Sequence, residues 1–582
     1  MSSEVVTKKV INSPESCVDD NLRGVIATFP MLQLHPKHRV ITVRNKGDTG
    51  RVAIIGGGGS GHEPFAAGYV GQGMLDGAIA GGIFASPPAG NVLYGISELY
   101  KYNSRGVLVI IGNYTGDRLN FGKAVEKAKI AGIKVDYVIV GEDVATNAKK
   151  SGGRSMVGEV LFYKLCGALA QKGESLETIR GVAIEANKYM ATLGVCLSPC
   201  SLPGQPPLFE IAQDEMELGA GVHGEAGIAK LKMSTAKEVV ALILDKIVEQ
   251  LKLRSGDRVV ATVNNLGATS ILEMNIISAE VKDYLKIKNI ILERTYSGLL
   301  KGSLDMHAFQ ICLLHLNKKD GDLWLELLDA PVVSTSWTGG SLSIRSDEVH
   351  VDESSELQEN IRKGNEGPRL SPRYQQVLRG TLENAAQALI TNEQLLNKLD
   401  SGCGDGDCGI TLKKFGESIL QYLKTAPMEY PSNVMWDLAE IAETKMGGSS
   451  GGIYSLGLGA ASQVLASARL NNLDAWLAAW ESAIDAISKY GGAEPGDRTM
   501  LDTLHAAFVV MKNKSRETDF NQLLRVTCEE AEKATQSTTK MVANAGRASY
   551  VSAEYLRDED AGARGVAVWL QGALKYIITQ NI

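Results

Sequence analysis

Short apolar runs alternate with helix-prone segments through residues 1–340. Three such runs are Val52–Ile55, Val107–Ile111 and Val135–Val140. A polar turn follows each run, and the segment Gly122–Ala131 is then typical of a helix. Apolar strands that alternate with helices indicate βαβ units and a mainly parallel sheet.

A proline-rich segment, Ser198–Pro207, interrupts this pattern. A second α/β region follows, with strands predicted at Arg258–Val263, Asn289–Glu293 and Ile311–Leu316. The sequence therefore predicts an α/β domain over residues 1–340 that is divided into two subdomains near residue 200.

The character of the chain changes after this domain. Residues 341–371 are polar and charged and lack apolar periodicity, which indicates an interdomain linker. Residues 372–582 are predicted to form an all-α domain, because apolar residues such as Leu378, Leu382 and Leu389 recur at helical spacing. Further helices are predicted near 433–446, 453–468, 473–489, 500–513, 519–536 and 562–578.

Composition and charge narrow the possible functions. The chain has 582 residues, a net charge of −7 and no long Lys/Arg run, so we expect a small phosphate-bearing ligand and no nucleic acid. It has no secretory apolar segment over Met1–Val10 and no stretch of about 18 apolar residues, so we expect a cytoplasmic protein without a membrane partner. The eight cysteines lack zinc-site spacing and are expected to be reduced.

Three aspartates lie close together in a glycine-rich segment: Asp400, Asp405 and Asp407. The glycines let the carboxylates converge, and Mg²⁺ prefers such oxygen ligands together with substrate phosphates. An ordinary Asp-Gly turn is the alternative. An EF-hand is excluded, because the sixth and twelfth positions counted from Asp400 are Asp405 and Thr411 instead of Gly and Glu.

Three further segments of the helical part fit a nucleotide. Met446–Gly452 precedes a predicted helix and offers backbone N–H groups and hydroxyls to phosphate, although such loops are often only flexible turns. Gly496–Met500 and Asp560–Arg564 also lie at predicted helix starts. The chain contains no Walker A sequence and no protein-kinase DFG or HRD sequence, which excludes both of these kinase classes.

Two histidines and an aspartate of the N-terminal part are candidates for catalysis. His62 and Asp117 each follow a predicted strand, where ligands bind in open α/β sheets and where general acid–base chemistry is possible. The run Gly56–Gly61 also matches a dinucleotide fingerprint, which is a weaker alternative in so glycine-rich a segment. His223 lies between glycines that leave its ring open to a small molecule, although a lone histidine is more often structural.

Together these motifs resemble the ATP-dependent dihydroxyacetone kinases, the fused two-domain family that includes triokinase/FMN cyclase. The matching segments occur in the family order and span nearly the whole chain: Gly58–Pro64, Asn113–Asp117, Gly221–Glu225, Gly404–Gly409 and Gly496–Met500.

The resemblance implies roles for the N-terminal candidates. His223 would bind the substrate carbonyl covalently as a hemiaminal, while His62 and Asp117 would assist this addition and deprotonate the attacking hydroxyl. The substrate-binding residues that it implies are Gly58, Gly59, Ser60, Gly61, His62, Gly112, Asp117 and His223.

For the C-terminal part the resemblance implies an all-helical barrel with ATP at one mouth. Asp400, Asp405 and Asp407 would hold two Mg²⁺ ions, with Mn²⁺ as an alternative for cyclase activity. The implied ATP-binding residues are Asp400, Cys408, Gly409, Gly448, Ser449, Ser450, Arg498, Thr499, Met500, Asp560 and Gly562. The family also implies a homodimer.

Two positions depart from the family pattern. Gly112 stands where family members often carry a lysine that contacts the substrate, so we expect a larger or less polar pocket. Residues 560–562 read Asp-Ala-Gly where Asp-Pro-Gly is common in the family, so Ala561 replaces the proline. The predicted activity is ATP-dependent phosphorylation of dihydroxyacetone or glyceraldehyde; the alternatives are an FAD-AMP lyase that forms cyclic FMN at the same metal site and a non-catalytic regulatory homologue.

Overall fold

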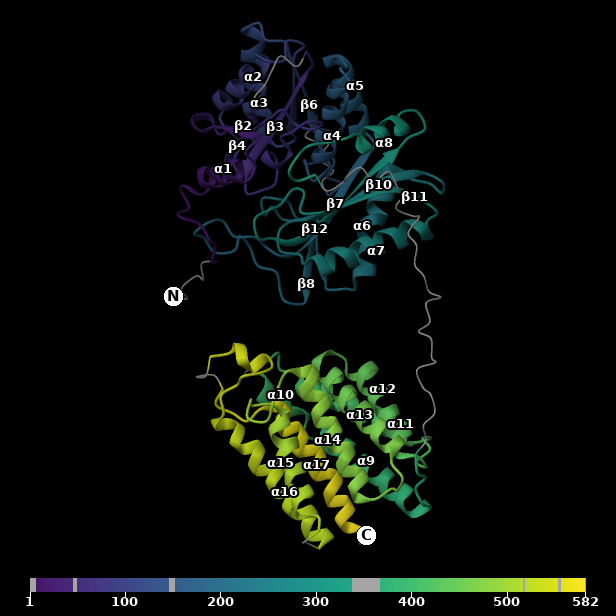
Figure 1. Cartoon of the computed structure of the whole chain (residues 1–582). Helices are drawn as coiled ribbons and strands as arrows, with labels where there is room; N and C mark the ends of the chain where they lie inside the picture. Colours follow the sequence, from purple (N-terminus) through teal and green to yellow (C-terminus); the bar gives the residue numbers. More distant parts are fainter. Residues whose placement is uncertain are drawn as a thin grey trace. The chain divides into compact units, whose positions relative to one another are not determined.

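The computed structural model describes residues 7–44, 50–145, 152–337, 367–402, 404–516, 519–552 and 556–580. Contacts divide the chain into two compact units, Met1–Glu353 and Ser354–Ile582. The first unit is α/β and the second is mostly helical (Figure 1), which confirms the predicted fold class. Most of the predicted linker, residues 341–366, lies outside the described residues.

The first sheet of the α/β unit has six strands in the spatial order β1-β2-β4-β3-β5-β6. The pairs β3–β4, β3–β5 and β5–β6 are parallel, as predicted, whereas β1–β2 and β2–β4 are antiparallel. The strands are β1 (Leu32–His35), β2 (Val40–Val43), β3 (Ala53–Ser60), β4 (Gly77–Ile83), β5 (Val107–Gly112) and β6 (Val135–Val140).

The second sheet has the order β11-β10-β12-β7-β8-β9. Among its described pairs β10–β11 is parallel and the others are antiparallel, so the mainly parallel prediction holds for the first sheet only. Two successive parallel strands need a crossover connection of about a dozen or more residues. The connection from β11 to β12 is shorter, so β12 runs in the opposite direction to β11. The strands are β7 (Met190–Ser198), β8 (Glu215–Leu218), β9 (Ala229–Lys232), β10 (Arg258–Asn265), β11 (Ile291–Gly298) and β12 (His307–Leu316).

Helices cover both sheets and also separate them. Apolar side chains of α2 and α3 pack on one face of the first sheet, and those of α6 and α7 pack on one face of the second. The remaining helices of this unit include α4, which lies against strands of both sheets. The helices are α1 (Cys17–Thr28), α2 (Ala89–Tyr100), α3 (Thr115–Ile130), α4 (Gly158–Gln171), α5 (Leu176–Asn187), α6 (Ala236–Leu251), α7 (Ile271–Ile287) and α8 (Gly321–Asp329), with short 3₁₀ turns η1 (Pro36–His38) and η2 (Ala67–Tyr69).

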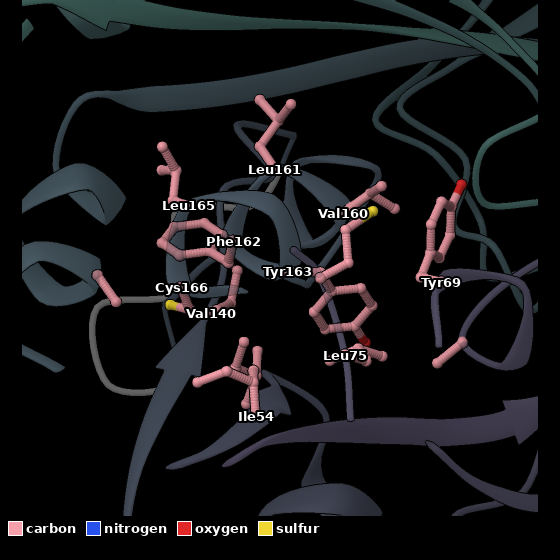
Figure 2. Packing of buried hydrophobic residues seen from close by; sticks show 14 of the residues in the cluster. Ile54, Tyr69, Leu75, Val140, Val160, Leu161, Phe162, Tyr163, Leu165 and Cys166 are labelled. Atoms are coloured by element: carbon pink, nitrogen blue, oxygen red, sulfur yellow. The ribbon is translucent and has the colours of Figure 1, made fainter. Parts of the chain in front are cut away.

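Helix α4 forms the centre of the α/β unit. Every residue from 158 to 170 is buried, as expected of a helix that packs on all sides. Figure 2 shows Phe162 and Tyr163 of α4 in one apolar cluster with Ile54 of the first sheet, and the same cluster includes Leu314 of the second sheet. Because α4 is shared by both sheets, it fixes one relative to the other and brings the polar side chain of Glu159 into the interior.

The glycine-rich segment forms part of a strand instead of a loop, because β3 continues to Ser60. Gly57 has φ +151°, and a Cβ there would lie 2.1 Å from the carbonyl oxygen of Ile79 in β4. A side chain would therefore prevent β3 and β4 from pairing. A turn follows β3 in place of a helix start, so the segment does not form the phosphate-binding helix N-terminus of a dinucleotide site.

The second unit is a bundle of helices (Figure 1) whose apolar faces form two adjoining clusters. The predicted helices correspond to the observed ones, with ends displaced by a few residues. None of the helices within the described ranges is both long and apolar enough for a bilayer crossing. The elements are α9 (Pro372–Thr391), α10 (Glu393–Asp400), α11 (Cys408–Leu423), α12 (Pro431–Ile441), the π-helical turn η3 (Ala442–Met446), α13 (Gly448–Ser467), α14 (Leu473–Gly491), α15 (Met500–Lys514), α16 (Phe520–Ser537), the 3₁₀ turns η4 (Thr538–Lys540) and η5 (Arg547–Tyr550), and α17 (Ala561–Thr579).

Candidate active site

His223 lies in the turn after β8, among aromatic side chains. Its ring centroid is 4.8 Å from that of His62, 4.7 Å from that of Tyr114 and 5.3 Å from that of Phe84. Its Nδ1 is 3.0 Å from Oε1 of Glu225, and a carboxylate can only accept, so the tautomer assigned from this contact leaves the lone pair on Nε2. The aromatic neighbours hold the ring in place, and a histidine nitrogen with a free lone pair is chemically able to act as a nucleophile.

Glu225 is suited to this orienting role. Its other oxygen, Oε2, accepts a hydrogen bond of 3.0 Å from the backbone N–H of His223. Burial raises the pKa of Glu225, but the hydrogen bonds and charge of His223 outweigh this effect and lower the pKa to about 2. The carboxylate is therefore ionised at neutral pH and binds both the backbone and the ring of His223.

His62 follows β3 and is buried, with 3% of its surface exposed. Its Nδ1 lies 2.9 Å from the carbonyl oxygen of Gly302, so Nδ1 donates and Nε2 carries the lone pair. Burial is the main cause that holds the pKa of His62 well below its usual range, and interactions with His223 and with the charge of Lys301 lower it further. Nε2 has no hydrogen-bond partner among the described residues, so a neutral, unpaired acceptor is available to a ligand here.

Asp117 lies in the first turn of α3, just after β5, and its Oδ1 is also buried without a partner among the described residues. Burial is the main cause that raises the pKa of Asp117 to about 6. A Cβ at Gly58 would lie 3.9 Å from Oδ2 of Asp117, so the glycine leaves the carboxylate accessible. A base with a pKa near neutrality is well matched to proton transfer.

The structure thus brings the three predicted catalytic residues together. The rings of His62 and His223 are in contact, and the charge of His223 acts on Asp117. A buried, unpaired acceptor is costly unless a ligand satisfies it, and His62 and Asp117 each present one.

The other predicted substrate-binding residues have different surroundings. A Cβ at Gly59 would approach the backbone of Ala85 to 2.8 Å, and Gly61 has φ +95° beside the ring of Phe84. The hydroxyl of Ser60 donates to the carbonyl oxygen of Gly81 at 2.9 Å, so it is used within the fold. Gly112 is buried at the end of β5, where a Cβ would lie 3.1 Å from Oε2 of Glu159.

A segment after β11 connects the parts of the site. The backbone N–H of Gly302 donates to the carbonyl oxygen of His62 at 3.0 Å, and that of Leu304 donates to Gly61 at 2.8 Å. The hydroxyl of Ser303 donates to the carbonyl oxygen of Val222 at 2.5 Å. The second sheet therefore positions both histidine loops. No sequence motif indicated this segment, because its contacts use mainly backbone groups.

In the helical unit the predicted metal residues also converge. One carboxylate oxygen each from Asp400, Asp405 and Asp407 lies within 4.8 Å of the others. Oδ2 of Asp400 accepts from the backbone N–H groups of Asp407 and Cys408, which folds the loop back on the end of α10. Burial and the negative charges of Asp405 and Asp400 raise the pKa of Asp407. Three clustered hard oxygens that repel one another fit a divalent cation such as Mg²⁺.

Arg547 of η5 approaches this cluster. Its guanidinium forms an ion pair with Asp405, and this hydrogen bond is the main cause that lowers the pKa of Asp405. Both side chains are largely exposed, at 64% for Arg547 and 52% for Asp405. The exposed carboxylates thus already attract a cation.

Apart from Asp400, which ends α10, the predicted ATP-binding residues lie at or next to the N-termini of four helices. Cys408 and Gly409 begin α11, and Gly448, Ser449 and Ser450 begin α13. Thr499 and Asp560 cap α15 and α17 by accepting hydrogen bonds from backbone N–H groups. A Cβ at Gly562 would lie 3.4 Å from Cβ of Met500, so the starts of α15 and α17 are adjacent. Helix N-termini of this kind favour phosphate.

Arg498, one of the implied ATP-binding residues, is buried. Its side chain is 2% exposed, and it donates to the carbonyl oxygens of Thr538 and Asp558. Its Nη1 is 3.9 Å from Oδ2 of Asp560. These contacts tie the segment before α17 to the start of α15.

Two family models match the chain: the Dak1 domain over residues 23–335 and the DAK2 domain over residues 402–575. The chain is 41% identical to the triokinase/FMN cyclase of Homo sapiens, over 98% of this chain and 100% of that protein. It is 32% identical to dihydroxyacetone kinase 2 of Saccharomyces cerevisiae, over 97% of this chain and 99% of the yeast protein.

A solved structure of a dihydroxyacetone kinase also matches this chain over nearly its full length. The dihydroxyacetone kinase from C. freundii in complex with AMP-PNP and Mg²⁺ matches with a TM-score of 0.66 and 28% identity, over 98% of this chain and 99% of that one. With both domain models matched in order and full-length relatives above 30% identity, this chain belongs to the family of fused Dak1–DAK2 proteins that includes the dihydroxyacetone kinases and the triokinase/FMN cyclases.

Proposed function

We propose that this protein transfers the γ-phosphoryl group of ATP to a hydroxyl of dihydroxyacetone or a similar short ketose or aldose such as glyceraldehyde. The observation that carries the proposal is the buried site in which the His223 ring touches that of His62, and in which His62 Nε2 and Asp117 Oδ1 lack partners among the described residues. Relatives named dihydroxyacetone kinase that match over nearly the full length support it.

The substrate would be held on His223. Nε2 attacks the carbonyl carbon, a C–N bond forms, and the carbonyl π electrons move to the oxygen, which takes up a proton. One proton leaves Nδ1 of His223 in the same process, so the hemiaminal is neutral. Such a small substrate offers few contacts, and a reversible covalent bond supplies the orientation that they cannot.

His62 and Asp117 would handle the proton of the reacting hydroxyl. Both present an unpaired buried acceptor, and the pKa of Asp117 near 6 leaves it mostly ionised at neutral pH. One of them accepts the hydroxyl proton while the oxygen attacks the γ-phosphorus and ADP departs.

Asp400, Asp405 and Asp407 would hold the metal, which we propose to be a pair of Mg²⁺ ions, with Mn²⁺ as an alternative for cyclase activity. Magnesium at this loop would neutralise the phosphate charge of the nucleotide. The helix starts at Gly448–Ser450, Thr499–Met500 and Asp560–Gly562 would offer backbone N–H groups to ATP. We further propose a homodimer, which sedimentation of the purified protein would test.

The test is ADP release coupled to NADH oxidation, with dihydroxyacetone, glyceraldehyde and larger ketoses as acceptors. The wild-type protein should consume ATP with at least one of the two trioses in the presence of Mg²⁺, and an Asp405→Asn variant should not. A folded wild-type protein that releases no ADP with any of these acceptors would favour the regulatory alternative.

A second activity is favoured by the 41% identity to a protein named triokinase/FMN cyclase. Cleavage of FAD to cyclic FMN would use the aspartates of the helical unit and would not need His223. A His223→Ala variant separates the two activities, because it should lose the kinase reaction and keep the cyclase reaction. Loss of both activities in a folded variant would show that the cyclase reaction also depends on the α/β unit.

A further inference from the structure

Lys301 is a buried cation beside the substrate site. It follows β11 on the second sheet, and its side chain is 3% exposed. Its Nζ donates to Oε2 of Glu159 at 2.8 Å, lies 3.4 Å from the carbonyl oxygen and the hydroxyl of Ser155, and lies 4.4 Å from the ring centroid of Phe65. A buried ion pair is seldom more stabilising than an apolar pair of the same size, so its presence points to another use.

Glu159 is arranged to hold this ammonium in place. Its side chain is 1% exposed and accepts from the hydroxyl of Ser155 at 2.7 Å and from that of Tyr163 at 3.0 Å, in addition to Lys301. Glu159 begins the central helix α4, which both sheets enclose. The carboxylate is thus fixed by the core and in turn fixes Lys301.

The ammonium and Gly112 both lie next to the same carboxylate oxygen of Glu159. A Cβ built at Gly112 would be 3.1 Å from Oε2 of Glu159, the same oxygen to which Lys301 donates, and 3.3 Å from Cβ of Ser155. A side chain at residue 112 would therefore point at the Lys301–Glu159 pair. The first sheet provides no side chain here, and the second sheet provides a cation instead.

Lys301 is also linked to the residues of the substrate site. The next residue, Gly302, binds both the carbonyl oxygen and the Nδ1 of His62. Phe65, over which the ammonium lies, would be 3.4 Å from a Cβ at Gly58, on the side that faces Asp117. The charge of Lys301 acts on both catalytic neighbours, because it lowers the pKa of His62 and opposes the rise in the pKa of Asp117.

We propose that Lys301 is the cation that positions the substrate in this site: it reaches from the second sheet to the carboxylate oxygen that Gly112 faces, and Glu159 holds it there. The inference deepens the proposed function and rests on it. The site would favour a substrate oxygen next to the carbonyl that His223 attacks, as in a hydroxyketone. A hydrogen bond to a charged group is worth about 10- to 100-fold in affinity.

The test removes the ammonium at residue 301, next to the second sheet, and then supplies one at residue 112, at the end of β5 in the first sheet. Lys301→Met should weaken dihydroxyacetone binding, measured by calorimetry, and raise KM by about 10- to 100-fold. It should also move the acidic limb of the pH profile to higher pH. Burial and the charge of Glu159 raise the pKa of Asp117, whereas Lys301 and His223 lower it, so the pKa rises when Lys301 is lost. Lys301→Met/Gly112→Lys should recover most of the affinity, because the new lysine pairs with Glu159 from the other side.

Matched variants separate the effect of the positive charge from the effect of filling the same space with an apolar side chain. Lys301→Met/Gly112→Met has the same length of side chain without charge and should not recover affinity. Lys301→Met/Glu159→Gln removes both buried charges and should stay folded, by circular dichroism and thermal unfolding, while binding weakly. The exposed Lys319→Met should behave as wild type, because its side chain is 85% exposed.

The contradicting results are distinct. Equal dihydroxyacetone affinity in wild type and folded Lys301→Met, or equal recovery with lysine and methionine at residue 112, would overturn the role of Lys301 and leave the kinase proposal intact. A wild-type protein that neither binds nor phosphorylates dihydroxyacetone would overturn the proposed function and, with it, this inference.

Discussion

The two candidate sites of this chain are prepared in opposite ways. In the α/β unit the site is largely buried: His62 and Asp117 are 3% and 9% exposed, the side chain of His223 is 23% exposed, and the His62 ring contacts the His223 ring and a backbone carbonyl. In the helical unit the side chain of Asp405 is 52% exposed, and three like charges lie within 4.8 Å. Packing organises the first site, whereas charge organises the second.

This difference follows from what each site would bind. A neutral three-carbon sugar has little charge and little surface, so its site must supply rigid, desolvated groups and a nucleophile. A nucleotide with its cation is highly charged and large, so clustered carboxylates and helix N-termini suffice to attract it from water. The comparison predicts that core substitutions damage the first site and that charge substitutions damage the second.

The largest expected effect is at His223. His223→Ala should lower kcat/KM for dihydroxyacetone by at least about 10⁴-fold, because covalent orientation accounts for that much or more of the rate. Coupled ADP release measures it, with FAD cleavage as a control for the helical unit. Kinase turnover near the wild-type value would contradict this role, since the site of the α/β unit would then not need His223 as a nucleophile.

Asp117 should have the next largest effect. Asp117→Asn keeps the size of the side chain but removes the base, and kcat should fall by about 10²- to 10⁴-fold. Binding of dihydroxyacetone by calorimetry should change much less than kcat. If affinity is lost while kcat is retained, Asp117 binds the substrate and does not accept the proton.

At the acidic loop the effect should extend to both reactions. Asp405→Asn should reduce kinase and cyclase rates by about 100-fold or more, because metal stabilisation of phosphate charge is worth several kcal/mol. Mg²⁺ should raise the melting temperature of the wild-type protein, because it binds the folded state, and should not raise that of the variant. An equal Mg²⁺-dependent rise in the variant would place the metal elsewhere.

The smallest effect is a pH dependence specific to the buried site. Since the pKa of Asp117 is raised to about 6, its carboxylate becomes protonated below pH 6 and can no longer accept a proton. The kcat/KM for dihydroxyacetone should therefore fall about tenfold per pH unit below pH 6. A flat profile down to pH 5, in protein shown to be folded there, would contradict this assignment.

Periodicity predicted the helical unit well. The helix predicted at 500–513 is α15, Met500–Lys514, because amphipathic spacing persists over several turns. Periodicity predicted the strands of the α/β unit less completely. Strand β4, Gly77–Ile83, has three glycines and two alanines and so lacks the β-branched pattern, and its pairing with β2 and β3 makes it a strand.

Candidate residues were found where a chemical group follows a predicted strand or lies among glycines. His62 and Asp117 follow strands, whereas His223 and the three aspartates of the loop lie among glycines. Lys301 and Glu159 were missed, because a lysine after one strand and a glutamate at the start of a helix are ordinary in a sequence. Their significance arises from tertiary packing that brings positions 142 residues apart to 2.8 Å.

In the proposed mechanism the site of the α/β unit holds its substrate through a covalent bond to His223. The direct test is NMR of dihydroxyacetone, labelled with ¹³C at the carbonyl carbon, bound to protein labelled with ¹⁵N at histidine. We predict a tetrahedral carbon with a one-bond ¹³C–¹⁵N coupling in the wild-type protein, and its absence in His223→Ala. Bound substrate that keeps a trigonal carbonyl, or a tetrahedral signal without coupling to nitrogen, would contradict this mechanism.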